Sequence, residues 1–160
     1  MITGVQFVGQ LKRMGITHVV WVPDSTLGAW DAAISAEKSL RLIRVCREGE
    51  AWAVAHGLHM GGAKPLVLIQ CTGLFDSGDS LRCALYDFGV PLFAAIGYRS
   101  YLIDGSTDSA RTYTEPILKA WNIDYKLIDT DDKIGELSEH YLACQQSPRP
   151  GVALIAEGRM

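Results

Sequence analysis

The sequence lacks the features that mark membrane, secreted and nucleic-acid-binding proteins. No apolar run reaches the roughly 20 residues that cross a bilayer, and the N-terminus has no basic start followed by an apolar block, so we expect neither a membrane span nor a signal peptide. Fifteen Lys and Arg against 18 Asp and Glu give a net charge of -3, which offers no basic surface for nucleic acid. The four cysteines form no CxxC pair, and we expect them to be reduced thiols in a cytoplasmic protein.

Several common catalytic and cofactor motifs are also absent. The sequence contains no GxxxxGK[ST] phosphate loop, no strand-associated GxGxxG fingerprint and no GxSxG nucleophile elbow. His56 and His59 are one helical turn apart, but no third ligand stands near them in the sequence, so we expect no metal site in this chain.

Strands and helices are predicted to alternate along the whole chain. The predicted strands are mostly continuous apolar runs, which is typical of a parallel sheet covered by helices on both faces. We expect strands at 17–23, 40–46, 64–71, 91–98, 125–129 and 151–157. We expect helices at 3–14, 26–37, 49–60, 79–88, 115–121 and 133–146, and a polar loop over 99–111. The pattern predicts one α/β domain over residues 1–160, with three α/β/α layers and a mostly parallel sheet of about six strands.

Polar residues follow four consecutive predicted strands, in the segments VPDS (22–25), REGE (47–50), QCTGLFDSGD (70–79) and GYRS (97–100). Ligands of parallel sheets bind at the carboxyl ends of strands, so these segments are a candidate site. Turns and helix caps use the same residue types, and Asp24, Ser25 and Asp79 fit that simpler interpretation. Glu48 fits it less well: it could complement a helix dipole, but the helix that it opens is Ala-rich and suited to close packing.

The segment REGEAWAVAHGLHMGGAKPLVLIQCTG (47–73) resembles the pyrimidine-binding domain of thiamine-diphosphate-dependent decarboxylases. In that family a glutamate opens an Ala-rich helix that ends in glycine, and a Gly-Lys-Pro-type turn leads into the next strand. Glu48, Gly57 and the turn at 62–65 match these elements. VPDS, QCTGLFDSGDSLR, IGYRS and TEPILKAW extend the resemblance and look most like the sulfopyruvate and phosphonopyruvate decarboxylases. Cys71 departs from the family, which more often has asparagine there.

The resemblance implies a role for Glu48. In the family, the matching glutamate hydrogen-bonds a ring nitrogen of the aminopyrimidine of thiamine diphosphate and favours the tautomer that activates the cofactor for attack on a 2-keto acid. Glu50, two residues further on, would point away from Glu48 on a helix. The cofactor-binding residues implied by the resemblance are Pro23, Asp24, Glu48, Thr72, Gly73 and Leu74, and the substrate-binding residues are Ser25, Gln70 and Arg99.

The resemblance covers one of the family's two cofactor-binding domains. The other, the PP domain, holds the diphosphate through magnesium and carries a Gly-Asp-Gly signature followed by an asparagine. The segment SGDS (77–80) lacks the second glycine, and the only asparagine is Asn122. We therefore expect the alpha subunit of a hetero-oligomer whose beta subunit carries the PP domain and the magnesium ion. Leu74, Phe75 and Tyr86 could line that interface or belong to the core, and we expect Tyr86 in the core.

Three functions are compatible with these residues. The first is a carboxy-lyase subunit that converts 3-sulfopyruvate or 3-phosphonopyruvate to the aldehyde and carbon dioxide. In that case Arg99 and Arg47 are candidates to pair with the anionic tail, although Arg99 could equally be structural. The second is half of an acetolactate-synthase-like carboligase. The third is a non-catalytic assembly subunit, against which Glu48 argues. The roles of Arg111 and the loop at 98–112 stay open.

Overall fold

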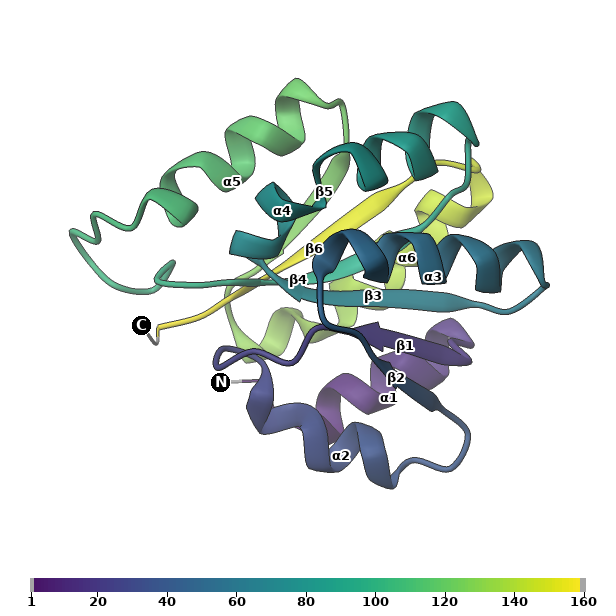
Figure 1. The fold of residues 1–160 in the computed structure, drawn as a ribbon. Coiled ribbons are helices and arrows are strands. Elements are labelled where there is room, and N and C mark those ends of the chain that lie inside the picture. Colours follow the sequence, from purple (N-terminus) through teal and green to yellow (C-terminus); the bar gives the residue numbers. More distant parts are fainter. Residues whose placement is uncertain (1, 159–160) are drawn as a thin grey trace.

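A computed structural model describes residues 2–158, and six parallel strands form its central sheet (Figure 1). The strands are β1 (His18–Trp21), β2 (Arg41–Arg44), β3 (Pro65–Gln70), β4 (Phe93–Tyr98), β5 (Asp124–Ile128) and β6 (Gly151–Ala156). Their order is β2-β1-β3-β4-β6-β5, and every neighbouring pair is parallel.

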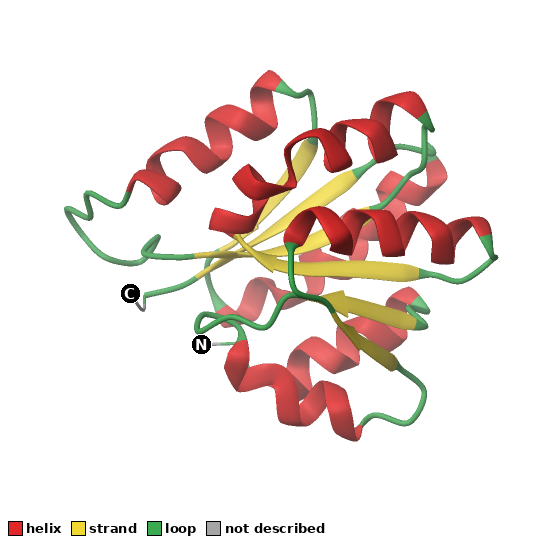
Figure 2. Cartoon of the chain, viewed as in Figure 1, coloured by secondary structure: helices red, strands yellow, loops and turns green. Residues whose placement is uncertain are grey.

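Helices cover both faces of this sheet, as Figure 2 shows. Helices α1 (Gly4–Met14), α2 (Asp31–Ala36) and α6 (Gly135–Gln146) pack on one face, and α3 (Glu48–Met60), α4 (Cys71–Arg82) and α5 (Ser109–Ala120) pack on the other. Successive strand residues point to opposite faces: Val19 and Trp21 of β1 lie in the first core, and Val20 lies in the second. Strands β1, β3, β4 and β6 are buried on both faces and are mostly apolar, whereas the edge strands β2 and β5 are partly exposed. The predicted three-layer α/β/α fold is confirmed.

Helix α1 shows how local sequence sets an element's ends. Gln6 N donates to Thr3 Oγ1 at 3.2 Å, and Gln6 Oε1 accepts from Thr3 N at 2.8 Å, which is a capping box. Gly15, in the left-handed conformation with φ 70°, ends the helix.

The largest difference from the predicted elements lies at residues 70–88. Helix α4 begins at Cys71, directly after β3, where the sequence predicts a polar turn. The helix predicted over 79–88 corresponds to the end of α4 and to the π-helical segment that follows it. Gly78 (φ 37°, ψ -118°) interrupts the helix, and a π-helical turn (Cys83–Asp87) follows it. The glycine, serine and aspartate residues of this segment favour turns, so the sequence pattern does not predict the helix. Tertiary packing stabilises the helix in spite of these residues. Tyr86 lies on the π-helical turn with 48% of its surface exposed, so the expectation that it belongs to the core is wrong.

Three other predicted helices differ at their ends. The helix expected over 26–37 is a 3-10 turn (Gly28–Trp30) followed by α2, and the last helix is likewise preceded by a 3-10 turn (Asp131–Ile134). Helix α5 begins at Ser109, earlier than expected, because Asp108 caps it by accepting a hydrogen bond from Ala110 N.

The topology places a reversal of chain direction between β1 and β3. After β1 the chain moves to the edge strand β2 and then returns past β1 to β3, so its direction across the sheet reverses there. In open α/β sheets the carboxyl ends of strands at such a reversal form the usual ligand crevice. Within residues 2–158, no helix has the length and apolar character required to cross a membrane.

Candidate functional site

Two glutamates in the first turn of α3 have different surroundings. Glu50 Oε2 accepts a hydrogen bond from Cys46 N at 3.0 Å, so its side chain folds back over the start of the helix. Glu48 lies instead against α4, where a Cβ on Gly73 would come within 2.6 Å of its carboxyl carbon and of Oε1. No hydrogen bond from the described residues reaches the Glu48 carboxylate, which is partly exposed. Glu50 therefore has a structural partner, whereas Glu48 is available to a ligand.

A hydrogen-bond network joins the carboxyl ends of β1, β3 and β4. Asp24 Oδ1 accepts from the backbone amides two and three residues further on, at 2.7 and 2.9 Å, which fixes the loop after β1. Gln70 Nε2 donates to Thr26 Oγ1. Gln70 Oε1 accepts from Thr72 Oγ1 at 2.9 Å and from Arg99 Nη1 at 3.3 Å. Gln70 thus joins two of the predicted strand-end segments, 70–79 and 97–100, and links both to Thr26, the residue that follows the segment 22–25.

Arg99 is committed to an internal ion pair. Its Nε donates to Asp108 Oδ2 at 2.8 Å and its Nη2 to Asp108 Oδ1 at 3.0 Å. Ser100 Oγ adds a third hydrogen bond to Asp108 at 3.0 Å. The Arg99 guanidinium and these neighbours lower the pKa of the Asp108 carboxyl to about 2. A cavity of about 460 Å³ lies between Arg99 and the loop at 103–108.

The buried thiol of Cys71 lies at the start of α4, next to this network. Its side chain has no exposed surface, and burial raises the pKa of the thiol. Cys71 is therefore a neutral packing residue at physiological pH, and it is not a candidate nucleophile.

The structure brings some of the predicted site residues together and separates others. Gln70, Thr72 and Arg99 are joined by hydrogen bonds, and Glu48 contacts Gly73. Pro23 and Ser25 are exposed on the loop after β1, where the Asp24 side chain fixes the backbone. The Leu74 side chain is only 3% exposed and packs in the core beneath α4.

The sequence reasoning missed three residues of the network, Thr26, Ser100 and Asp108. Asp108 could have been found as a helix cap, since it precedes the start of α5. Its contact with Arg99 could not, because the loop must fold back to bring the two side chains together.

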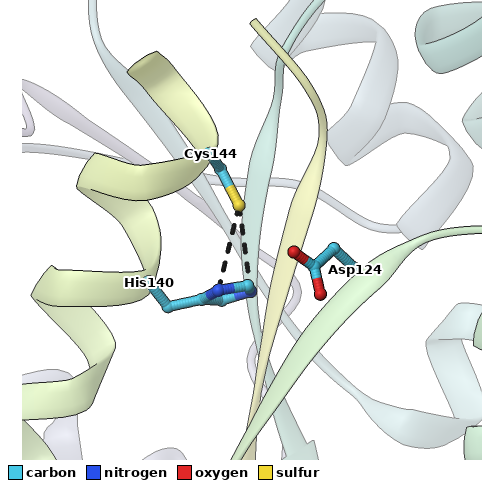
Figure 3. A group of neighbouring side chains, drawn as sticks. All are labelled: Asp124, His140 and Cys144. Atoms are coloured by element: carbon cyan, nitrogen blue, oxygen red, sulfur yellow. Dashed lines mark hydrogen bonds between the residues drawn. The ribbon is translucent and has the colours of Figure 1, made fainter. Parts of the chain in front are cut away.

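A second group of polar side chains lies at the opposite, amino-terminal edge of the sheet (Figure 3). The ligand-type atoms of Asp124, His140 and Cys144 all lie within 4.8 Å of one another. However, Cys144 Sγ lies 3.9 Å from both ring nitrogens of His140, over the flat face of the ring. The nitrogens' lone pairs lie in the ring plane, and Asp124 already pairs with Arg149 at 2.9 Å. In this arrangement the three side chains do not aim at a common ion.

Comparisons with known proteins agree on one group of enzymes. No family model matches the chain. A phosphonopyruvate decarboxylase from Streptomyces viridochromogenes is 29% identical over 153 residues, which are 92% of this chain and 37% of that relative. A sulfopyruvate decarboxylase subunit alpha from Methanothermobacter thermautotrophicus is 26% identical over 136 residues, which are 81% of this chain and 82% of that subunit.

Solved structures show the same fold. Benzoylformate decarboxylase from Polynucleobacter necessarius superposes with a TM-score of 0.77 and 20% identity, over 98% of this chain and 30% of that chain. An X-ray structure of a protein from Mycobacterium smegmatis gives the same TM-score of 0.77 and the same coverage at 17% identity. At these identities the likeness shows the fold. The chain spans well under half the length of these two structures and of the Streptomyces relative.

Proposed function

Because the chain is a thiamine-diphosphate-dependent decarboxylase-like domain, we propose that it is the pyrimidine-binding alpha subunit of a 2-keto acid decarboxylase. The observation that carries the proposal is the position of Glu48. Its carboxylate lies at the carboxyl edge of the sheet, against the bare Cα of Gly73, and no described residue donates a hydrogen bond to it. Glu50 is excluded from the same role because its side chain accepts from the Cys46 amide.

The surroundings of Glu48 fit the aminopyrimidine end of thiamine diphosphate. A side chain at residue 73 would fill the space that the Glu48 side chain occupies. The absence of a side chain at Gly73 therefore leaves room for an acceptor carboxylate at the carboxyl edge of the sheet. When bound, the cofactor supplies the electron sink for loss of carbon dioxide from a 2-keto acid. Glu48 would share a proton with the ring nitrogen that faces it and so act as the acid–base group of this chain.

We propose that a second subunit holds the other end of the cofactor. The sequence contains no Gly-Asp-Gly segment, so this chain offers no counterpart of the family's magnesium–diphosphate anchor. One relative that this chain matches over 82% of its length is named as an alpha subunit. We assign the magnesium ion and the diphosphate to a beta subunit that carries a PP domain, with the active site at the interface.

The substrate that we propose is a 2-keto acid with an anionic tail, 3-sulfopyruvate or 3-phosphonopyruvate. Arg99 supports this choice, because a guanidinium forms paired hydrogen bonds with sulfonate or phosphonate oxygens. Its side chain is about one-third exposed (32%) beside the 460 Å³ cavity. Asp108 holds two of its nitrogens, so the tail would share or displace that carboxylate. Gln70 lies between Arg99 and Thr26 and would orient the guanidinium.

The experiment is release of carbon dioxide from a panel of 2-keto acids, with thiamine diphosphate and magnesium present. We expect no release from the purified chain and robust release after co-expression with a PP-domain subunit. Turnover by the chain alone would contradict the two-subunit proposal. Joining of the decarboxylated fragment to a second 2-keto acid would identify a carboligase, and an inactive complex would identify an assembly subunit.

A further inference from the structure

Glu48 and Trp52 lie one helical turn apart on α3, and both contact α4. Glu48 contacts Gly73, and Trp52 Nε1 donates a hydrogen bond to Ser77 Oγ at 2.7 Å. Ser77 Oγ in turn donates to the backbone oxygen of Gly73 at 2.5 Å. Residues i and i+4 share one face of a helix. The pairs Glu48–Gly73 and Trp52–Ser77 therefore belong to one α3–α4 interface and lie one helical turn apart in it.

The Trp52–Ser77 pair is shielded from water. Trp52 and Ser77 are each 1% exposed, so water does not compete for their hydrogen bond. A serine hydroxyl has one proton to donate and can accept another, which is how Ser77 is used here. The two hydrogen bonds, from Trp52 to Ser77 and from Ser77 to the Gly73 carbonyl, form a relay that connects the Gly73 carbonyl to α3. This Trp52–Ser77 relay fixes the position of α4 along α3.

The requirement for glycine at position 73 comes from Glu48. A Cβ there would lie 2.6 Å from Glu48 Cδ, nearer than atoms approach without a shift, and closer still to Glu48 Cγ. Gly73 is not among the glycines with positive φ, and it lies inside α4. In an ordinary helical conformation alanine is the better helix former. The backbone therefore tolerates alanine at this position, and the three atoms that an added Cβ would meet first all belong to the Glu48 side chain.

We infer that Gly73, held by the Trp52–Ser77 relay, is a positioning residue that sets where the Glu48 carboxylate lies. The catalytic consequence rests on the proposed function, whereas the contact is a property of the chain alone. A methyl group at residue 73 must displace the Glu48 carboxylate. A displacement of a catalytic group by about 1 Å from the reacting atoms can lower the reaction rate by about 10²-fold.

The contact is tested first by the melting temperature of the full chain. Gly73→Ala should lower it by roughly 2–10 °C through overpacking. In a Glu48→Ala background, which removes the clashing atoms, the same substitution should change it little. Gly57→Ala is the matched control: Gly57 is an exposed α3 glycine with no atom within 4 Å of an added Cβ, so this variant should keep or raise the melting temperature.

Two results would overturn the contact: equal losses from Gly73→Ala in both backgrounds, and no loss in either. Should Gly73→Ala alone fail to fold, the double variant with Glu48→Ala should fold, and its failure to do so would also contradict the inference.

The positioning role is tested by exchange of the thiamine diphosphate C2 proton for deuterium, in the complex with a PP-domain subunit. Gly73→Ala should slow exchange by about 10²-fold, and Gly57→Ala should leave it unchanged. If Glu48→Gln slows exchange while Gly73→Ala does not, the positioning role is wrong and the proposed function stands. If Glu48→Gln leaves exchange unchanged, the proposed function fails, and the melting temperatures still decide whether the contact exists.

Discussion

Arg99 and Asp108 face each other with two parallel hydrogen bonds, of 2.8 Å from Nε and 3.0 Å from Nη2. Two parallel N–H donors also suit the oxygens of a sulfonate or phosphonate. The pair therefore fixes the cation at the carboxyl end of β4 and leaves Nη1 directed at Gln70. A substrate tail at this position has to compete with a carboxylate of the chain itself.

Arg99→Ala should raise KM for a sulfonate- or phosphonate-bearing substrate by about 10- to 10²-fold, the scale of a lost hydrogen bond to a charged group. The KM for pyruvate, which has no anionic tail, should change less. Arg82→Ala is the control, because Arg82 pairs with Asp79 and Asp87 on the exposed side of α4. Equal changes for both substrates would show that Arg99 is structural.

The Arg99–Asp108 pair should also stabilise the fold in a pH-dependent way. The pKa of Asp108 is lowered from 3.8 to about 2, chiefly by its hydrogen bond with Arg99. The folded state thus binds this proton less readily than the unfolded state, and the stabilisation is complete above the unfolded pKa. It should disappear as the pH falls from 3.8 to about 2.

This prediction is checked by melting temperatures of the wild type and Asp108→Asn across acid pH. The difference should be largest above about pH 4 and should vanish near pH 2. Asp104→Asn, an exposed position in the same loop, is the control and should follow the wild type. A difference that does not depend on pH would contradict the assignment.

Glu50 should affect stability and leave the chemistry intact. Glu50→Ala removes the acceptor of the Cys46 amide at the start of α3 and should lower the free energy of unfolding by about 1 kcal/mol. Chemical denaturation measures this loss. Glu50→Gln keeps an acceptor oxygen, so it should preserve both stability and turnover. Loss of turnover in Glu50→Gln would mean that the two glutamates have been assigned the wrong roles.

The fold could be predicted because its signal is local. Buried strands such as β3 and β4 are continuous apolar runs, and Thr3 and Gly15 mark the ends of α1. The early part of α4 could not be predicted, because Gly73 and Gly78 read as turn residues. Gly73 is there to make room for Glu48, a contact that no local pattern encodes.

The sequence could predict which strand ends form the site, but it could not predict all of the hydrogen-bond partners of the site residues. The parallel topology requires the segments after β1, β3 and β4 to share one edge, where Gln70 and Arg99 are hydrogen-bonded. The pairing of Arg99 with Asp108 depends on the path of the loop between them. The exposure of Tyr86 depends on the π-helical turn that carries it. Both are set by tertiary packing.

The most direct test of the central claim is the rate of C2 proton exchange of thiamine diphosphate in the complex carrying Glu48→Gln. Gln matches Glu in size, so folding and assembly should be preserved, but it does not carry the proton that Glu48 shares with the ring nitrogen. We predict that exchange and turnover both fall by about 10²-fold or more, and that Glu50→Gln exchanges at the wild-type rate. Wild-type exchange in Glu48→Gln would contradict the account.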